Sequence, residues 1–141
     1  MLKNIPSILS PELLKILMEM GHGDEIVLGD GNFPAANYGQ RLVRLDGHGV
    51  PEILTAILQV FPLDRFEANA FLMEKTPGDE TKTPIWETYR EIASKGDVHF
   101  KGFDFVERFA FYERAKKAYA VIATGESALY ANIILKKGVI E

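Results

Sequence analysis

The chain contains no cysteine, and this absence removes several kinds of chemistry at once. Without thiols it has no disulfide bonds, no thiolate nucleophile and no cysteine-ligated metal site. A chain without disulfides fits a reducing compartment. The N-terminus also has no basic segment followed by a long apolar run, so we expect neither a signal peptide nor a membrane span. These observations predict a cytoplasmic protein with no membrane partner.

An excess of positive charge is also missing. Lysine and arginine together number 16 against 20 acidic residues, and the formal net charge is −4. The basic cluster at Arg114, Lys116 and Lys117 is balanced by the neighbouring Glu107 and Glu113. Nucleic-acid-binding domains carry a concentrated basic face. We therefore expect no nucleic-acid partner.

Histidine is scarce, with three in the chain, and no two of them stand at the spacing of metal ligands. Phosphate-binding loops ending in Gly-Lys-Ser or Gly-Lys-Thr are absent. Gly47-His48-Gly49 follows a predicted strand and precedes a predicted helix, but Glu52 occupies the place of the third glycine in the dinucleotide fingerprint. These patterns give no positive signal for a metal or a cofactor. A metal site formed by His22, Asp24 and Asp30 after folding and a nucleotide-binding module remain minor alternatives.

What is present is typical of one globular domain. The 141 residues are 47% hydrophobic and 26% charged, which suits a single domain spanning residues 1–141. Ser10, Pro11 and Glu12 form a strong helix start, and we expect Gly21 to end that helix in a left-handed conformation. The apolar patterns predict helices over 11–20, 51–61, 84–95 and 108–117, and strands over 25–28, 41–45, 66–73, 118–123 and 132–135.

Helices and near-continuous apolar strands alternate along the chain, without repeats or linkers. Strands that are apolar on both faces belong to sheets that are covered on both sides, and alternation with helices favours parallel strands. The sequence thus predicts an α/β fold, namely a three-layer α/β/α, Rossmann-like single domain with a mostly parallel sheet. The aromatic segment 97–106 gives no clear secondary-structure signal.

The stretch from Gly21 to Pro34 holds the candidate site. His22 follows the first helix, and Asp30 stands at the carboxyl end of the strand 25–28. Ligands of α/β proteins bind outside the carboxyl ends of strands, so a histidine and an aspartate that meet there would suit acid/base catalysis. The alternative interpretation is a histidine that only complements the helix dipole and an aspartate that only starts a turn.

Three motifs, in order along nearly the whole chain, resemble the family of L-fucose mutarotases and D-ribose pyranases. The first is similar to the opening of the family, the second to the fucose branch, and the third to the shared carboxyl-terminal motif. The matching residues are 20–25 (MGHGDE) with 30 and 33–35, then 108–115 (RFAFYERA), and finally 124–126 with 130–136. The match is poorest between residues 66 and 106.

The resemblance implies an enzyme that interconverts the α and β anomers of L-fucose without a cofactor or metal. It implies that His22 is the proton donor. The residues that it implies as sugar ligands are Asp30, Arg108, Tyr130, Ala131 and Asn132. It also implies homo-oligomers, as pentameric rings that in this family often stack into decamers. Ala131 stands where many fucose mutarotases have glycine and the ribose relatives often have alanine, so D-ribose pyranase is the alternative.

These residue types suit that chemistry. Mutarotation brings a proton to the ring oxygen while the anomeric hydroxyl loses one, and imidazole has the unperturbed pKa, about 6.5, nearest working pH. Arg108 and Asn132 can bind sugar hydroxyls, and the Tyr130 ring can cover an apolar sugar face. Without the resemblance, Arg108 would be interpreted as an ion-pair partner of Glu107 or Glu113. Asn132 would be interpreted as a turn residue, and a non-catalytic sugar-binding protein is the remaining alternative.

Overall fold

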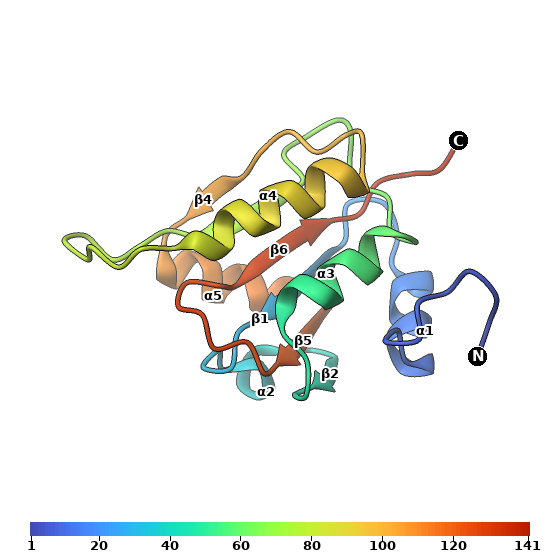
Figure 1. Ribbon diagram of the computed structural model, residues 1–141, viewed down its shortest axis with the longest axis horizontal. Helices are drawn as coiled ribbons and strands as arrows, with labels where there is room; N and C mark the ends of the chain where they lie inside the picture. Colours follow the sequence, from blue (N-terminus) through green and yellow to red (C-terminus); the bar gives the residue numbers. More distant parts are fainter.

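The computed structural model describes residues 1–141, and its central strands are buried on both faces because helices cover both sides of the sheet (Figure 1). The helices are α1 (Pro11–Glu19), α2 (Ala35–Tyr38), α3 (Val50–Leu58), α4 (Pro84–Gly96) and α5 (Arg108–Lys117). The strands are β1 (Glu25–Gly29), β2 (Leu42–Leu45), β3 (Ala70–Met73), β4 (Asp104–Val106), β5 (Ala120–Thr124) and β6 (Ile133–Lys136).

The six strands form one sheet in the order β2-β5-β1-β6-β3-β4. β5 pairs in parallel with both β1 and β2, and β3 pairs in parallel with β4, whereas β6 runs antiparallel to its neighbours β1 and β3. Five strands therefore point one way and β6 the other, which confirms the predicted α/β fold with a mostly parallel sheet. The connection from β5 to β6 has no helix and is shorter than a parallel crossover requires, so the last strand returns in the opposite direction.

Two hydrophobic clusters lie on opposite faces of the sheet. α1, α3 and α4 pack on one face and α2 and α5 on the other, as the three-layer prediction requires (Figure 1). Successive side chains of β1 point to opposite faces of the sheet, so Ile26 and Leu28 belong to the first cluster and Val27 belongs to the second. This arrangement leaves the carboxyl ends of the parallel strands free to carry a site.

The helix α1 begins as predicted but ends differently. The Ser10 hydroxyl accepts a hydrogen bond from the Leu13 N–H at 3.2 Å. Gly21 is not left-handed, since the chain leaves the helix in an extended conformation at Met20. The Lys137 ammonium donates to the carbonyl oxygens of Leu17 and Met20, each at 2.6 Å. A lysine from the other end of the chain therefore caps this helix in place of glycine.

Three further elements depart from the sequence pattern. The pattern does not predict α2, because one turn of helix is too short to show a period. The strand β3 begins at Ala70 rather than at residue 66, because the Asn69 side chain donates to the carbonyl oxygens of Asp64 and His99 and bends the chain before the strand. β4 is an edge strand of three residues in the segment that gave no signal. No helix has both the length and the apolar character needed to cross a bilayer.

Candidate active site

A cavity of about 300 Å³ opens at the carboxyl ends of β1 and β3, beside the turn that enters β6 and the start of α5. Four residues that the sequence analysis proposed as sugar ligands line it, namely Asp30, Arg108, Tyr130 and Asn132. Its other lining residues are Asn32, Phe33, Met73, Thr76, Asp79, Tyr112 and Leu129. A volume at the small end of ligand sites, with several converging polar groups, suits a small polar molecule.

Asp30 comes directly after β1 and is buried. Its N–H donates to the Asn132 side-chain oxygen at 2.7 Å, and its carboxylate accepts from the Asn32 N–H at 3.0 Å. Burial raises the pKa of the Asp30 carboxyl above its ordinary value, backbone N–H bonds oppose this, and the nearby Glu126 carboxylate adds to the rise. Asp30 is therefore a carboxylate that takes up a proton more readily than an exposed one.

Tyr130 has a φ of 55°, in the left-handed region that non-glycine residues rarely adopt. Its carbonyl oxygen accepts from the Trp86 indole N–H at 2.7 Å, and the Ala131 carbonyl accepts from the Tyr89 hydroxyl at 2.7 Å. Ala131 itself is buried in the core beneath α3 and α4 and does not line the cavity. The hydrogen bonds that these two side chains of α4 donate to the main chain therefore hold the Tyr130 ring and the Asn132 amide at the cavity.

Arg108 is the first residue of α5 and is free of the ion pairs considered for it above. The Glu107 carboxylate caps the helix by accepting from the N–H groups of Phe109 and Ala110, each at 3.0 Å. Glu113 pairs instead with a lysine one turn further along α5. The Arg108 guanidinium bonds only the Tyr112 hydroxyl, at 3.3 Å, so most of its donors remain open toward the cavity.

The sequence analysis missed Asp79 and Thr76 as lining residues. Both lie in the loop between β3 and α4, which projects from the body of the molecule (Figure 1). Hydrogen bonds to the Asp79 carboxylate from the Thr81 side chain, the Tyr130 hydroxyl and the Thr81 N–H lower the pKa of Asp79 to about 2. The Pro77-Gly78-Asp79 sequence indicated a turn, but nothing local showed that the turn would reach Tyr130, 51 positions later.

His22 does not lie at this cavity. It precedes β1 whereas Asp30 follows it, and the five residues of the strand span about 16 Å at about 3.3 Å each. The expectation that His22 and Asp30 meet within one chain is therefore wrong. The imidazole contacts Asp64 instead, with 3.1 Å between Nε2 and the carboxylate oxygen. The helix-dipole alternative is wrong too, because Lys137 occupies the carbonyl end of α1.

The nucleotide alternative also fails on the geometry of α3. An anion-binding glycine loop needs free N–H groups at the start of its helix. Here the Glu126 carboxylate accepts from the Val50 N–H at 3.1 Å, so a negative charge already occupies that position. His48, which precedes this helix, pairs with Glu52 in its first turn at 2.9 Å. A phosphate at this place would be repelled.

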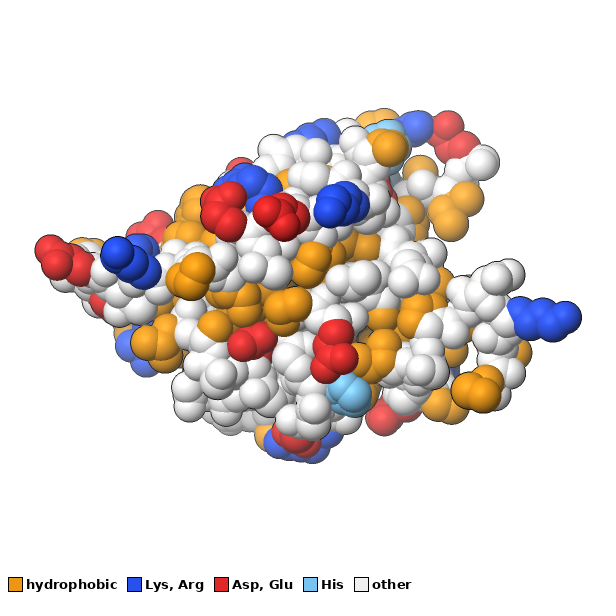
Figure 2. All heavy atoms as spheres, viewed as in Figure 1, with side chains coloured by type: hydrophobic (Ala, Val, Ile, Leu, Met, Phe, Trp, Pro, Cys, Tyr) orange, Lys and Arg blue, Asp and Glu red, His pale blue; other side chains and the backbone are white.

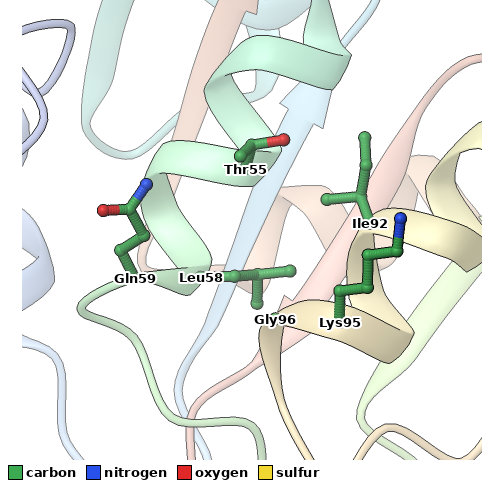
Figure 3. A pocket seen from close by; sticks show the side chains of 6 residues that line it. All are labelled: Thr55, Leu58, Gln59, Ile92, Lys95 and Gly96. Atoms are coloured by element: carbon green, nitrogen blue, oxygen red, sulfur yellow. The ribbon is translucent and has the colours of Figure 1, made fainter.

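A larger hollow of about 610 Å³ lies between α3 and α4 (Figure 3). Its lining residues are Thr55, Leu58, Gln59, Ile92, Lys95 and Gly96. On this face hydrophobic side chains gather between the two helices and charged side chains follow α4 (Figure 2). The hollow contains no carboxylate and no aromatic ring, so it offers neither a proton acceptor nor a stacking surface for a sugar. No group of three or more histidine, aspartate or glutamate residues is placed to hold a metal ion.

The chain is similar to known proteins over nearly its whole length. A model of the RbsD / FucU transport protein family matches residues 3–140. The fucose mutarotase of Danio rerio is 53% identical, over 99% of this chain and 94% of that protein. The crystal structure of FucU from Bifidobacterium longum superposes with a TM-score of 0.95 at 57% identity, covering 99% of this chain and 100% of that chain. The fucose mutarotase of Streptococcus pneumoniae, solved in complex with L-fucose, has a TM-score of 0.92, 50% identity and the same coverage.

Proposed function

Because the chain belongs to the RbsD / FucU transport protein family, we propose that it is an isomerase, a mutarotase that interconverts the α and β anomers of L-fucose. The observation that carries this proposal is the cavity beside Asp30, with four polar groups from three segments of the chain, in a fold shared with a mutarotase solved with L-fucose. The substrate is a free monosaccharide, and the reaction forms no covalent bond between the sugar and the protein.

Each polar group has a role that its surroundings support. Asn132 uses its oxygen to bind the Asp30 N–H, which leaves its amide N–H groups for sugar hydroxyls. Arg108 presents a fork of donors, and Tyr130 presents its ring and hydroxyl at the rim. Ala131 contributes through its backbone alone, because its side chain points into the core.

We propose that His22 acts in the cavity of a second copy of the chain. Its side chain is 46% exposed, and the neighbouring Phe66 is exposed as well. Leu129, which lines the cavity, and Phe109, which follows Arg108 in α5, are also exposed apolar residues. The His22 surface and the cavity are different surfaces of one chain, so a contact between them is heterologous, and contacts of this kind form a ring where the rotation between neighbouring copies closes. The pentamer and its stacked decamer are the forms that the family resemblance implies, and native mass spectrometry would count the subunits.

In the proposed reaction, protonated His22 gives its proton to the sugar ring oxygen as the bond from that oxygen to C1 breaks. The Asp30 carboxylate takes the proton of the anomeric hydroxyl, and C1 becomes an aldehyde. Rotation about the C1–C2 bond presents the other aldehyde face, and both protons return as the ring closes. The raised pKa of the buried Asp30 supports its role as acceptor, since the carboxyl holds the proton long enough to return it.

Magnetisation-transfer NMR of L-fucose at anomeric equilibrium tests the proposal. We expect wild type to exchange α and β signals far faster than buffer, and Asp30→Asn to lose this effect. Asp46→Asn, which changes an exposed carboxylate after β2 that pairs with Arg44, is the matched control and should keep full activity. Exchange at the buffer rate with saturable sugar binding would instead indicate a non-catalytic sugar-binding protein.

A parallel series with D-ribose separates the mutarotase from the pyranase alternative. Because the Ala131 side chain does not line the cavity, the alanine there does not by itself select ribose. We expect faster acceleration with L-fucose than with D-ribose, and the reverse order would favour the pyranase. We retain the cytoplasm as the predicted location, which cell fractionation would check.

A further inference from the structure

Asp64 is a buried carboxylate that does not line the cavity beside Asp30. Its side chain is 2% exposed, and Asp30 is the only other buried carboxylate of the chain. Burial of a charged group is unfavourable unless partners compensate for the lost water. A charge kept in the interior away from the cavity therefore calls for an explanation in terms of what it contacts.

The main chain fixes the position of Asp64 on every side. Its N–H donates to the Lys136 carbonyl at 3.0 Å, and its own carbonyl accepts from the fully buried Asn69 side chain at 2.7 Å. The carboxylate accepts from the Phe66 N–H at 3.2 Å. Burial raises the pKa of Asp64, but the hydrogen bonds from the Phe66 N–H and from the His22 ring outweigh it and lower the pKa overall. The group is thus a rigid anion.

The turn that carries His22 is equally well fixed. The Gly21 N–H donates to the Asp24 carboxylate at 2.8 Å, and the Asp24 N–H returns a bond to the Gly21 carbonyl at 3.2 Å. The Gly23 N–H donates to the Lys137 carbonyl at 2.8 Å, and Gly23 has a φ of 88°. A closed turn and a rigid anion therefore determine where the ring lies.

We propose that Asp64 is a positioning residue for His22, which holds Nε2–H inward and leaves Nδ1 as the nitrogen that exchanges the proton with the sugar. This inference rests on the proposed function. Because a carboxylate only accepts hydrogen bonds, a neutral His22 in this contact must carry its proton on Nε2. The lone pair of Nδ1 is then free on the half-exposed ring. When His22 is protonated, Asp64 still accepts from Nε2–H, so the proton that passes to the sugar is the one on Nδ1.

A purely structural role explains the contact less well. An ion pair whose histidine is half in water contributes little to stability, so it does not offset the burial of Asp64. The Phe66 ring lies 5.8 Å from the His22 ring and tilts against it, which restricts the imidazole further. The closed turn, the Asp64 carboxylate and the Phe66 ring together fix the position of the half-exposed imidazole. A proton donor needs such a fixed position in order to reach the sugar ring oxygen in each reaction cycle.

The test uses the full-length assembled protein and the variants Asp64→Asn and Asp64→Ala. We expect kcat for L-fucose exchange to fall at least tenfold in both, with KM within about twofold of wild type, because the sugar ligands are untouched. Glu67→Gln is the matched control, since it removes an exposed acidic charge three residues away that pairs with Lys136 and not with His22. It should keep wild-type kcat.

A second readout does not depend on activity. Nitrogen-15 NMR of the histidine side chains at a pH where His22 is neutral should show the Nε2–H tautomer in wild type and a mixture of tautomers in Asp64→Ala. Unchanged kcat in a folded Asp64→Asn, or an Nδ1–H tautomer in wild type, would overturn the inference. If wild type does not accelerate exchange, the proposed function fails and the tautomer still decides the role of Asp64. If the variants do not fold, the wild-type tautomer alone decides.

Discussion

The indole N–H of Trp86 donates to the carbonyl oxygen of Tyr130 at 2.7 Å, where the main chain has a φ of 55°. A non-glycine residue in this left-handed conformation costs about 1–2 kcal/mol, so neighbouring contacts must hold it in place. One turn further along α4, Tyr89 binds the next carbonyl, that of Ala131. The hydrogen bonds from these two side chains of α4 thus hold the strained segment against the cavity beside Asp30.

Replacement of Trp86 by phenylalanine keeps an aromatic ring and removes the donor. Since the Tyr130 turn can then relax, we expect KM for L-fucose to rise about tenfold with a smaller change in kcat, and unfolding free energy to fall by about 1 kcal/mol. Concentration-dependent exchange NMR and urea denaturation measure the two effects. An unchanged KM in a folded Trp86→Phe protein would show that the indole does not position the site.

Tyr89→Phe is expected to lower the stability of the fold and to leave sugar binding unchanged. The variant leaves the Ala131 carbonyl unpaired in the interior, which lowers the free energy of unfolding by about 1–3 kcal/mol. Burial, together with the charges of Glu126 and Asp30, raises the pKa of Tyr89, so the hydroxyl stays protonated through the neutral range and its bond persists there. Urea denaturation at several pH values checks both points, and a loss that varies strongly between pH 6 and 8 would contradict them.

Asp30→Asn is expected to reduce kcat by about 10²–10⁴-fold without loss of stability at pH 7. The folded pKa of Asp30 is raised, so the folded state binds this proton more tightly than the unfolded chain. The stability that this group contributes is present at low pH and is lost as pH rises through the raised pKa. At neutral pH the buried charge of Asp30 therefore destabilises the folded state, and asparagine removes that charge. Parallel urea curves at pH 4 and 7 test this, and clear destabilisation of the variant at pH 7 would refute it.

Lys137→Met is expected to lower the free energy of unfolding by about 2–3 kcal/mol, because two carbonyl oxygens at the end of α1 lose a charged donor. Lys117→Met, at the exposed end of α5, is the control and should stay within about 0.5 kcal/mol of wild type. Equal stability of the two variants would mean that Lys137 does not cap α1.

Local sequence signals predicted the fold well where a single segment determines its own structure. The helix 108–117 matches its prediction, and β1 differs from its prediction by one residue, because capping and apolar patterns are local. The end of α1 was mispredicted because its cap, Lys137, comes from the opposite end of the chain. β4 gave no signal, since an edge strand of three residues carries no period.

The candidate site was predictable only in part. Asp30 followed from its place after a strand, but the convergence of Arg108, Tyr130 and Asn132 on it came from the family resemblance, because the sheet order that joins them is not local. The predicted strand over 25–28 already contradicted the expectation that His22 lies beside Asp30 in one chain. A residue before a strand and a residue after it lie at opposite ends of that strand, and β1 separates His22 from Asp30 in this way.

The pairing of His22 from one subunit with the Asp30 cavity of another is the central claim, and a mixing experiment tests it most directly. His22→Ala and Asp30→Asn proteins would be co-expressed with different tags, and the mixed oligomers purified on both tags. Each variant alone should be inactive in L-fucose exchange NMR. In randomly mixed rings about a quarter of the interfaces would join an intact His22 to an intact Asp30. We predict recovery of about a quarter of wild-type activity, and mixed oligomers as inactive as either variant alone would contradict the account.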